Sequence, residues 1–307
     1  MVASQAGVNF LRWPFGFRVG GMVARPPVVL TIAGFDPSSG AGITADVKTI
    51  AAHDCYGVCC ITALTVQSTG GVRRVEGMDP AVISETLQEL ASDLQMAAVH
   101  IGMLANRQVV MAVVRFLEES KRPHVVLDPI LKSSSGTELL DAAGTRLMME
   151  KLLPLAELVT PNLDEAGVMT GLPVTNLDDM RAAASRLHSL GAANVVVTGG
   201  HLEKAIDLLS FSSSRGREQE VFKADRQRSN STHGTGCAFA TALACHLAHG
   251  RGIPEAVLLA KAYVVAAIAN AQPVGHGIGP VHHLYRVNLQ RRPSSVVIDK
   301  EQADSRR

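Results

Sequence analysis

Aromatic side chains and a dominant charge are both scarce in this sequence. Phe, Trp and Tyr make up 4% of the 307 residues, and 29 basic side chains are balanced by 28 acidic ones. Surfaces that bind nucleic acid combine clustered positive charge with aromatic platforms on which bases stack. The composition therefore indicates no nucleic-acid partner. No apolar run reaches the length of a membrane span, so no membrane partner is expected either.

The five cysteines lack the spacing of a metal site. Cys55, Cys59, Cys60, Cys237 and Cys245 include no Cys-x-x-Cys pair, so they do not resemble a zinc framework. An odd number of cysteines without a secretion signal indicates reduced thiols in a cytoplasmic protein. Apolar residues make up 47% of the chain, which is enough for a sizeable core.

Residues 1–27 differ from the rest of the chain. They contain three arginines and no acidic residue, and they lack the continuous apolar stretch of a signal peptide. Either they form an organelle-type presequence or Met22 is the true start. We expect a disordered extension over 1–27, a single domain over 28–287 and a disordered tail over 288–307.

Short apolar runs alternate with helical patterns for most of the length. This alternation predicts an α/β fold with a mostly parallel central sheet and helices on both faces. The predicted strands are 28–33, 58–65, 97–101, 125–127, 158–160 and 195–197, with a hairpin of 206–211 and 220–223 around a turn at 212–219. The predicted helices are 42–53, 79–93, 106–120, 139–152, 180–190, 238–248 and 254–271.

The helix after residue 237 begins with a glycine-rich turn, Thr232-His233-Gly234-Thr235-Gly236-Cys237. Backbone N–H groups at such a helix start bind anions, above all phosphate, and small residues let the ligand approach. The field at the helix start is expected to lower the pKa of Cys237 and make it a candidate base. The same turn also fits a loop that only packs a helix against the sheet.

Polar residues recur just after the predicted strands. Because the carboxyl ends of parallel strands share one edge of a sheet, these side chains are expected to gather there, opposite the glycine-rich turn. They are Asp36, Gln67, Asp128, Asn162, Glu165 and Thr198. Taken singly, Asp36 also fits a turn or helix cap, Gln67 an exposed loop residue, and Asn162 with Glu165 a capping box.

The combination of motifs resembles the hydroxymethylpyrimidine/phosphomethylpyrimidine kinases of thiamine synthesis, within the ribokinase-like superfamily. The motifs span residues 31–283 in the family's order. They are TIAGFDPSSGAGITADVKT, ITALTVQST, IGML, VVLDPIL, VTPNLDEA, VVVTGGH, THGTGC and GIGPVHH. The resemblance implies a three-layer α/β/α sandwich, ATP and Mg²⁺ as cofactors, a homodimer, and a kinase without fused pathway modules.

The resemblance also implies roles for individual residues. The pyrimidine pocket would be lined by Asp36, Ala41, Gln67, Met103 and Ile130. Asn162 and Glu165 match the superfamily's Asn-x-x-Glu motif, with Asp128 as a further candidate near the metal. Thr198 and Gly200 would border the nucleotide. Gly234, Thr235 and Gly236 would hold the transferred phosphoryl group, and Cys237 would be the base.

Three positions depart from the family pattern. Ser39 stands where the family often has Gly, and Thr198 replaces a frequent lysine. A lysine expected at position 134 is Ser134 here, and Lys132 lies two places earlier, so a phosphate role for Lys132 does not follow from the pattern.

Two other functions fit part of the sequence. A pyridoxal or pyridoxine kinase shares the Gly-Thr-Gly-Cys ending, although Gln67 together with Met103 favours the pyrimidine. A non-catalytic regulator that kept the fold is disfavoured by the presence of Cys237, Asn162 and Glu165.

Overall fold

The structure is a computed structural model that describes residues 25–119, 122–133, 135–200, 205–225, 227 and 229–286. The predicted tail 288–307, Met22 and all but the last three residues of the predicted extension 1–27 lie outside these residues, as does Ser134. The limits predicted for the domain remain a prediction.

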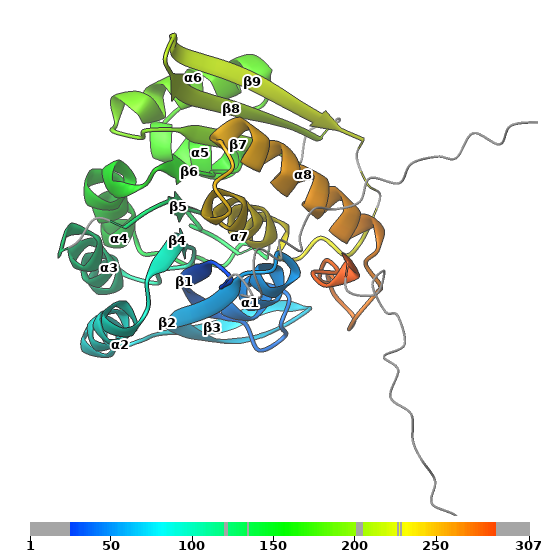
Figure 1. The fold of residues 1–307 in the computed structure, drawn as a ribbon. Helices are drawn as coiled ribbons and strands as arrows, with labels where there is room; N and C mark the ends of the chain where they lie inside the picture. The colour runs from blue at the N-terminus through cyan, green and yellow to red at the C-terminus, as the bar shows by residue number, and fades with distance from the viewer. Residues whose placement is uncertain are drawn as a thin grey trace, which may run out of the picture.

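The described strands form one nine-stranded sheet in the order β3-β2-β1-β4-β5-β6-β7-β8-β9 (Figure 1). Six neighbouring strands are parallel, which confirms the predicted sheet: β2 (Tyr56–Ser68), β1 (Val28–Phe35), β4 (Met96–Ile101), β5 (Val125–Leu127), β6 (Leu158–Val159) and β7 (Val195–Gly199). Antiparallel strands extend both edges: β3 (Gly71–Gly77), β8 (Ala205–Ser213) and β9 (Gly216–Ala224).

The strand order reverses between β1 and β4. The chain moves outward from β1 to β2 and β3, then returns to β4 on the other side of β1. In open α/β sheets, ligands bind at such a switch point, in the crevice beyond the carboxyl ends of the strands. The topology therefore points to the loops after Phe35 and Ile101.

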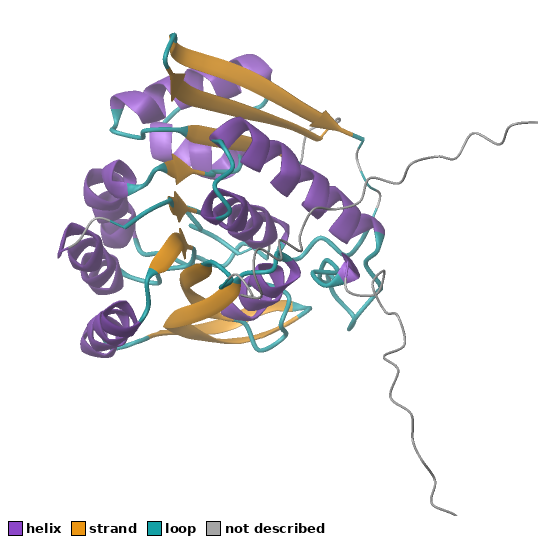
Figure 2. Ribbon diagram, in the orientation of Figure 1, coloured by secondary structure: helices purple, strands orange, loops and turns teal. Residues whose placement is uncertain are grey.

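Helices cover both faces of the sheet, as predicted (Figure 2). One face carries α1 (Gly42–Ala52), α7 (Thr235–Ala248) and α8 (Ile253–Ala269). The other face carries α2 (Pro80–Asp93), α3 (Arg107–Glu119), α4 (Ala142–Leu147), α5 (Leu163–Thr170) and α6 (Leu177–Ser189). Each residue from Cys237 to Leu247 is buried, because α7 lies between the sheet, α1 and α8. None of the helices in the described ranges is long and apolar enough to cross a bilayer.

Caps written into the sequence fix several helix starts. Asp79 accepts a hydrogen bond from Ala81 N, and Asn106 accepts one from Val109 N. Asn162 and Glu165 form the reciprocal capping box of α5, at 2.9 Å in both directions. Each cap satisfies backbone N–H groups that have no partner within the helix.

Four sequence predictions of local structure are wrong in detail. β3 begins at Gly71, in a stretch for which no strand was predicted, and Gly71 adopts a φ of 124° where the chain turns back. β2 runs to Ser68, so Gln67 lies on a strand rather than in a loop. The β8–β9 strands continue almost to the hairpin tip, with Gly216 at φ 109°. The helix predicted over 139–152 is α4 followed by a π-helical turn, Met148–Leu152.

A buried ion pair joins α8 to the sheet. Lys261 Nζ lies 2.6 Å from Asp207 Oδ2, and both side chains are almost completely buried. The other carboxylate oxygen of Asp207 accepts a hydrogen bond from Gly199 N at 3.1 Å. The pair therefore holds the carboxyl end of β7 against α8.

We predict that Lys261→Met lowers the free energy of unfolding by about 3–5 kcal/mol, because it leaves the Asp207 carboxylate buried without a counter-charge. Denaturant titrations measure the change. The double variant Lys261→Met/Asp207→Asn removes that charge and keeps an acceptor for Gly199 N. It should recover most of the loss, and a double variant as unstable as the single one would contradict the electrostatic explanation.

Candidate active site

The loop after β1 is organised by a single carboxylate. Asp36 accepts hydrogen bonds from Ser38 N and Oγ, both at 2.7 Å, from Gly40 N at 3.1 Å, from Ala41 N at 2.9 Å and from His233 Nε2 at 3.0 Å. Burial alone would raise the pKa of Asp36, but these hydrogen bonds lower it to about 2. The oxygens are occupied by the chain itself, so Asp36 shapes the loop around a ligand.

Two glycine-rich segments touch at backbone level at the switch point. A Cβ on Gly234 would lie 1.8 Å from Gly40 O, and a Cβ on Gly40 would lie 2.3 Å from His233 Cδ2. Gly234 has a φ of 79° and is the N-cap of α7. Only residues without side chains let the loop after β1 pack so closely on the start of α7.

The predicted anion site lies at the start of α7. No side chain caps this helix within the described residues. Gly236 is exposed, and a Cβ there would meet Asp128 Oδ2 at 3.7 Å. Thr235 N donates to Thr232 O, so Gly236, which lies beside Asp128, is the position at which the helix start is open to an anion.

The expected low pKa of Cys237 is wrong for this structure. Burial raises its pKa well above the usual value, and the charges of Asp46, Asp128 and Glu165 raise it further. A hydrogen bond from the Gly42 backbone opposes the shift without reversing it. The field of the helix start is too small to overcome a buried site with three carboxylates, so the thiol is protonated at neutral pH.

Two buried carboxylates face the anion site. Burial raises the pKa of Glu165 to about 8, with a further contribution from the charge of Asp128. Burial also raises the pKa of Asp128, to about 6, with His100 opposing and Asp46 adding to the shift. A divalent ion bound beside both carboxyl groups would stabilise both charges and lower both pKa values.

The donor set fits Mg²⁺ shared with a substrate. Among the described residues, no group of three or more His, Cys, Asp and Glu side chains could hold a metal ion alone. Mg²⁺ commonly binds one or two carboxylates and completes its shell with phosphate oxygens and water. Asp128 and Glu165, next to a phosphate cradle, match that pattern.

The predicted pyrimidine residues lie around the loop after β1. Gln67 Nε2 is 3.4 Å from His233 Nε2, and the proton of that ring nitrogen is already donated to Asp36. The amide of Gln67 therefore retains hydrogen-bonding capacity for a ligand. Met103 and Ile130 belong to one apolar cluster with Ala63 and Leu139. Ala41 contributes its backbone N–H to Asp36.

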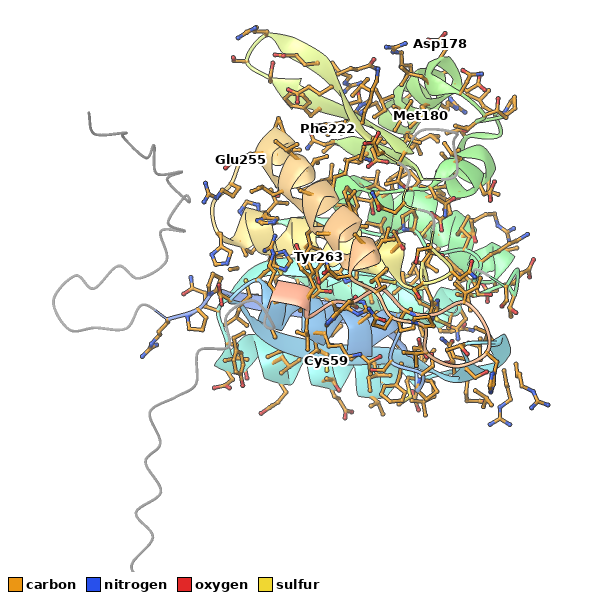
Figure 3. The ribbon with its side chains drawn as sticks, turned by 90° about the vertical axis from the view of Figure 1, so that its right-hand side faces the viewer. Cys59, Asp178, Met180, Phe222, Glu255 and Tyr263 are labelled. Carbon is orange, nitrogen blue, oxygen red and sulfur yellow. The ribbon has the colours of Figure 1, made fainter. Side chains whose placement is uncertain are left out.

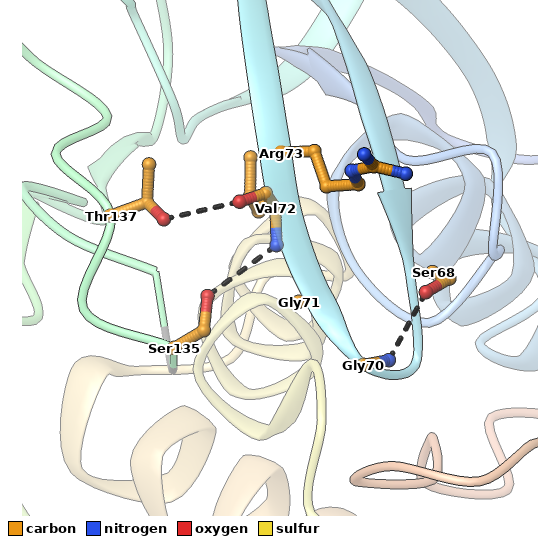
Figure 4. Close-up of a pocket in the computed structure, with 7 residues that line it drawn as sticks. All are labelled: Ser68, Gly70, Gly71, Val72, Arg73, Ser135 and Thr137. Atoms are coloured by element: carbon orange, nitrogen blue, oxygen red, sulfur yellow. Dashed lines mark hydrogen bonds between the residues drawn. The ribbon is translucent and has the colours of Figure 1, made fainter.

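A cavity of about 270 Å³ lies beside this group. It is open to solvent and lies between the β2–β3 turn and the loop after β5, whose lining residues Figure 4 shows. Its lining residues are Ser68, Gly70, Gly71, Val72, Arg73, Ser135 and Thr137. Both backbone groups of Val72 are hydrogen-bonded to the loop after β5. Val72 N donates to Ser135 Oγ, and Thr137 Oγ1 donates to Val72 O. None of the predicted pyrimidine residues lines this cavity, although Ser68 directly follows Gln67.

The predicted nucleotide residues lie at the neighbouring strand ends. Thr198 on β7 forms a parallel bridge with Asn162, which caps α5. Gly200 is exposed just beyond the end of β7. This places Thr198 and Gly200 on the β7 side of the edge and Gln67 on the β2 side, with the start of α7 between them. His201 lies outside the described residues.

Sequence reasoning missed the role of His233 and a buried network behind the site. Thr31 and Thr241 donate hydrogen bonds to Asp46 at 2.7 and 2.9 Å, and His100 Nδ1 lies 3.4 Å from the same carboxylate. Burial would lower the pKa of His100, but Asp46 and then Asp128 raise it. Only the position of His233, directly before the glycine-rich turn, could have indicated its role.

The departures from the family pattern have structural consequences. Ser39 adopts a φ of 65°, a region that favours glycine, and Lys48 Nζ donates to both Ser39 O and Ser39 Oγ at 2.7 Å. The lysine thus holds the serine in this conformation. The backbones of Lys132 and Glu138 pair as an isolated antiparallel β-bridge in the loop after β5.

Comparison with known proteins decides the family. A model of the family described as phosphomethylpyrimidine kinase matches residues 36–282. The chain belongs to the phosphomethylpyrimidine kinase family. It is 39% identical to a hydroxymethylpyrimidine/phosphomethylpyrimidine kinase of Streptomyces coelicolor, over 84% of this chain and 94% of that one. The ribokinase-like fold and the kinase class expected from the sequence are thereby confirmed.

Two further relatives of this kinase differ in length or in substrate. A bifunctional thiamine biosynthesis protein of Geobacter sulfurreducens is 43% identical over 83% of this chain, which spans only 52% of that protein. A solved structure of Bacillus subtilis pyridoxal kinase with ADP has a TM-score of 0.78 and 32% identity, and covers 86% of this chain and 100% of its own.

The raised pKa of Glu165 predicts a pH-dependent stability. Between its ordinary value of 4.5 and about 8, the folded protein holds a proton that the unfolded chain has lost. The free energy of unfolding should therefore fall as pH rises through this window, by up to about 1.4 kcal/mol per pH unit. Urea titrations without ligands at several pH values measure the slope.

The variant Glu165→Gln should flatten this slope, because an amide does not titrate and Gln preserves the capping box. Glu150→Gln replaces an exposed carboxylate and serves as the matched control, with the slope of the original protein. If both variants kept the same slope, the titrating group would not be Glu165.

Proposed function

We propose that this kinase transfers the terminal phosphoryl group of ATP to 4-amino-5-hydroxymethyl-2-methylpyrimidine and then to the resulting monophosphate. The observation that carries the proposal is the convergence of three elements at the β1/β4 switch point. These are an uncapped glycine turn, the carboxylate pair Asp128 and Glu165, and the amide of Gln67 beside the Asp36 loop. The relatives' names support the pyrimidine, and the ADP complex of a solved relative supports ATP.

In this proposal the backbone from Gly234 to Gly236 holds the transferred phosphoryl group as negative charge develops on it. Gln67 orients the amino-pyrimidine edge, while Met103 and Ile130 pack against the ring. Asn162, Thr198 and Gly200 border the nucleotide. Mg²⁺ held by Asp128 and Glu165 would supply positive charge to the phosphate oxygens.

Cys237 is the proposed base for the first phosphorylation. Its thiol is protonated in the unliganded site, largely because it is buried and faces carboxylate charges. A divalent cation bound by Asp128 and Glu165 would offset the negative charges that raise this pKa. The thiol would then release its proton more easily and accept one from the hydroxymethyl group of the substrate.

A pyridoxal kinase activity is the second candidate, because the solved relative from Bacillus subtilis is named for it. The discriminating experiment measures ADP formation with ATP and saturating amounts of either the pyrimidine alcohol or pyridoxal. We expect the pyrimidine to have the higher kcat/KM. A higher value for pyridoxal would replace the proposed substrate, and no turnover with either would favour a non-catalytic binding role.

A homodimer and a cytoplasmic location are also part of the proposal. The family resemblance supports the dimer, and the five free cysteines support the location. Analytical ultracentrifugation of the full chain tests the first, and fractionation of the source cells tests the second.

We predict that Cys237→Ala lowers kcat for the alcohol step by about 10²–10⁴-fold, the usual effect of losing a general base. The second step should suffer much less, because a phosphate acceptor with a pKa of about 6 is already ionised at neutral pH. Rapid-quench assays started from either acceptor measure the two steps separately. Equal losses in both steps would assign a positioning role to the thiol.

Gly236→Val is the matched comparison, because its side chain would project into the shared phosphoryl cradle. Both phosphorylations should be lost in this variant. If one step survived, the chain would contain a second site.

We also predict that Gln67→Leu raises KM for the pyrimidine about 5–150-fold, which corresponds to about 1–3 kcal/mol for one lost buried hydrogen bond. KM for ATP should stay near its original value, since Gln67 lies on the β2 side of the edge. A variant with weakened ATP binding alone would place Gln67 on the nucleotide side.

A further inference from the structure

A second cluster of reactive groups lies at the opposite end of α7 from the glycine turn. Cys55 lies in the loop between α1 and β2, and its Sγ is 3.3 Å from His249 Nε2. Both atoms also contact the carbonyl oxygen of His53, which lies 3.5 Å from Cys55 Sγ and 2.8 Å from His249 Nε2. His249 is the C-cap residue of α7, and Cys245 lies one turn earlier on the same helix. The α1–β2 loop is at the amino end of β2, whereas the candidate active site lies at the carboxyl ends of the strands. The kinase reaction described above uses none of these three residues.

The surroundings of Cys55 favour its thiolate. The thiol of Cys245 donates a hydrogen bond that lowers the pKa of Cys55, and the hydrogen bond and charge of His249 lower it further. Burial and the charge of Asp54 oppose this shift but do not cancel it. The imidazolium form of His249 is favoured in turn, because Cys55 raises its pKa and the carboxyl end of a helix stabilises positive charge.

Two neighbouring histidines, His53 and His246, are neutral at pH 7, in contrast to the imidazolium form favoured for His249. Burial lowers the pKa of His53 to about 4 and that of His246 to about 3, so both are neutral at pH 7. The ring of His53 lies between those of His246 and Tyr263, with centroid distances of 5.0 and 4.5 Å. Tyr263, labelled in Figure 3, closes the cluster from α8.

The two thiols differ in their access to solvent. Cys55 is 9% exposed and lies between two exposed residues, Asp54 and Tyr56, whereas Cys245 is 0% exposed. A small molecule arriving from solvent therefore meets Cys55 first. Cys245 is the interior thiol of the pair, and burial together with its interaction with Cys55 raises its pKa well above the usual value.

We propose that Cys55, His249 and Cys245 form a thiol oxidation site, separate from the candidate active site, at which a peroxide oxidises Cys55 and Cys245 then closes a disulfide. In the first step the Cys55 thiolate attacks one peroxide oxygen. The O–O bond breaks, and the leaving hydroxide takes a proton from His249 to become water. In the second step the sulfur of Cys245 attacks the sulfenic acid of Cys55, the S–O bond breaks, and water leaves with the proton of Cys245. Two thiols lose two electrons in total, and hydrogen peroxide is reduced to two waters.

The test treats the full-length protein with hydrogen peroxide, blocks the remaining thiols with iodoacetamide and maps the peptides without reductant. We expect a Cys55–Cys245 disulfide to form before any other cysteine is modified. Cys59, on β2 in Figure 3, is the internal reference, because burial and Asp46 raise its pKa. Oxidation of Cys59 or Cys237 ahead of Cys55 would overturn the proposal.

Two variants separate the steps. In Cys245→Ala, Cys55 should stop at the sulfenic acid, which dimedone traps. The absence of a trapped adduct would overturn the assignment of Cys55 as the first thiol.

His249→Gln should slow oxidation of Cys55 about tenfold, because less thiolate is present at pH 7. Cys59→Ser is the matched control and should leave the rate unchanged. An unchanged rate in His249→Gln would overturn the role of the histidine, and all of these readouts are independent of the kinase substrate.

Discussion

The candidate site depends on the hydrogen bonds that the carboxylate of Asp36 accepts. Its oxygens accept five hydrogen bonds, four from the loop that follows β1 and one from His233 at the start of α7. Because the carboxylate is buried, each donor compensates for solvation that the charge has lost. The glycines at positions 40 and 234 let the two backbones touch at this point. The position of the start of α7 relative to the Asp36 loop is thus set by one charged group.

A second electrostatic feature acts against the unliganded protein. Asp128 and Glu165 are buried close to the thiol of Cys237, and each negative charge makes the others harder to form. Such an arrangement is costly without a cation and becomes favourable when one binds. A cation bound beside these groups would therefore change the protonation of the site as well as its charge.

Much of the fold follows from the sequence, because its signals are local. Apolar runs of β-branched residues mark the parallel strands, and Asp79, Asn106 and Asn162 mark helix starts by side-chain caps. β3 was missed because it is an edge strand whose start depends on one glycine conformation. Within the site, the residue types could be predicted from the sequence, but their protonation states and hydrogen-bond partners could not. The pKa of Cys237 depends on three carboxylates from distant segments, and the role of His233 depends on Asp36, which the sequence places 197 residues away.

That separation has a consequence for how the protein is made. The Asp36–His233 contact joins the first βα loop to the start of α7, so almost the whole chain must be synthesised before the two residues can meet. Contacts between such distant segments form late and slowly, since a long loop must close before any stabilisation is gained. While the ribosome is still producing the β8–β9 hairpin, the emerging chain can already pair β1, β2 and β4, but the start of α7 is not yet in place. The candidate active site is therefore incomplete until α7 leaves the ribosome and docks.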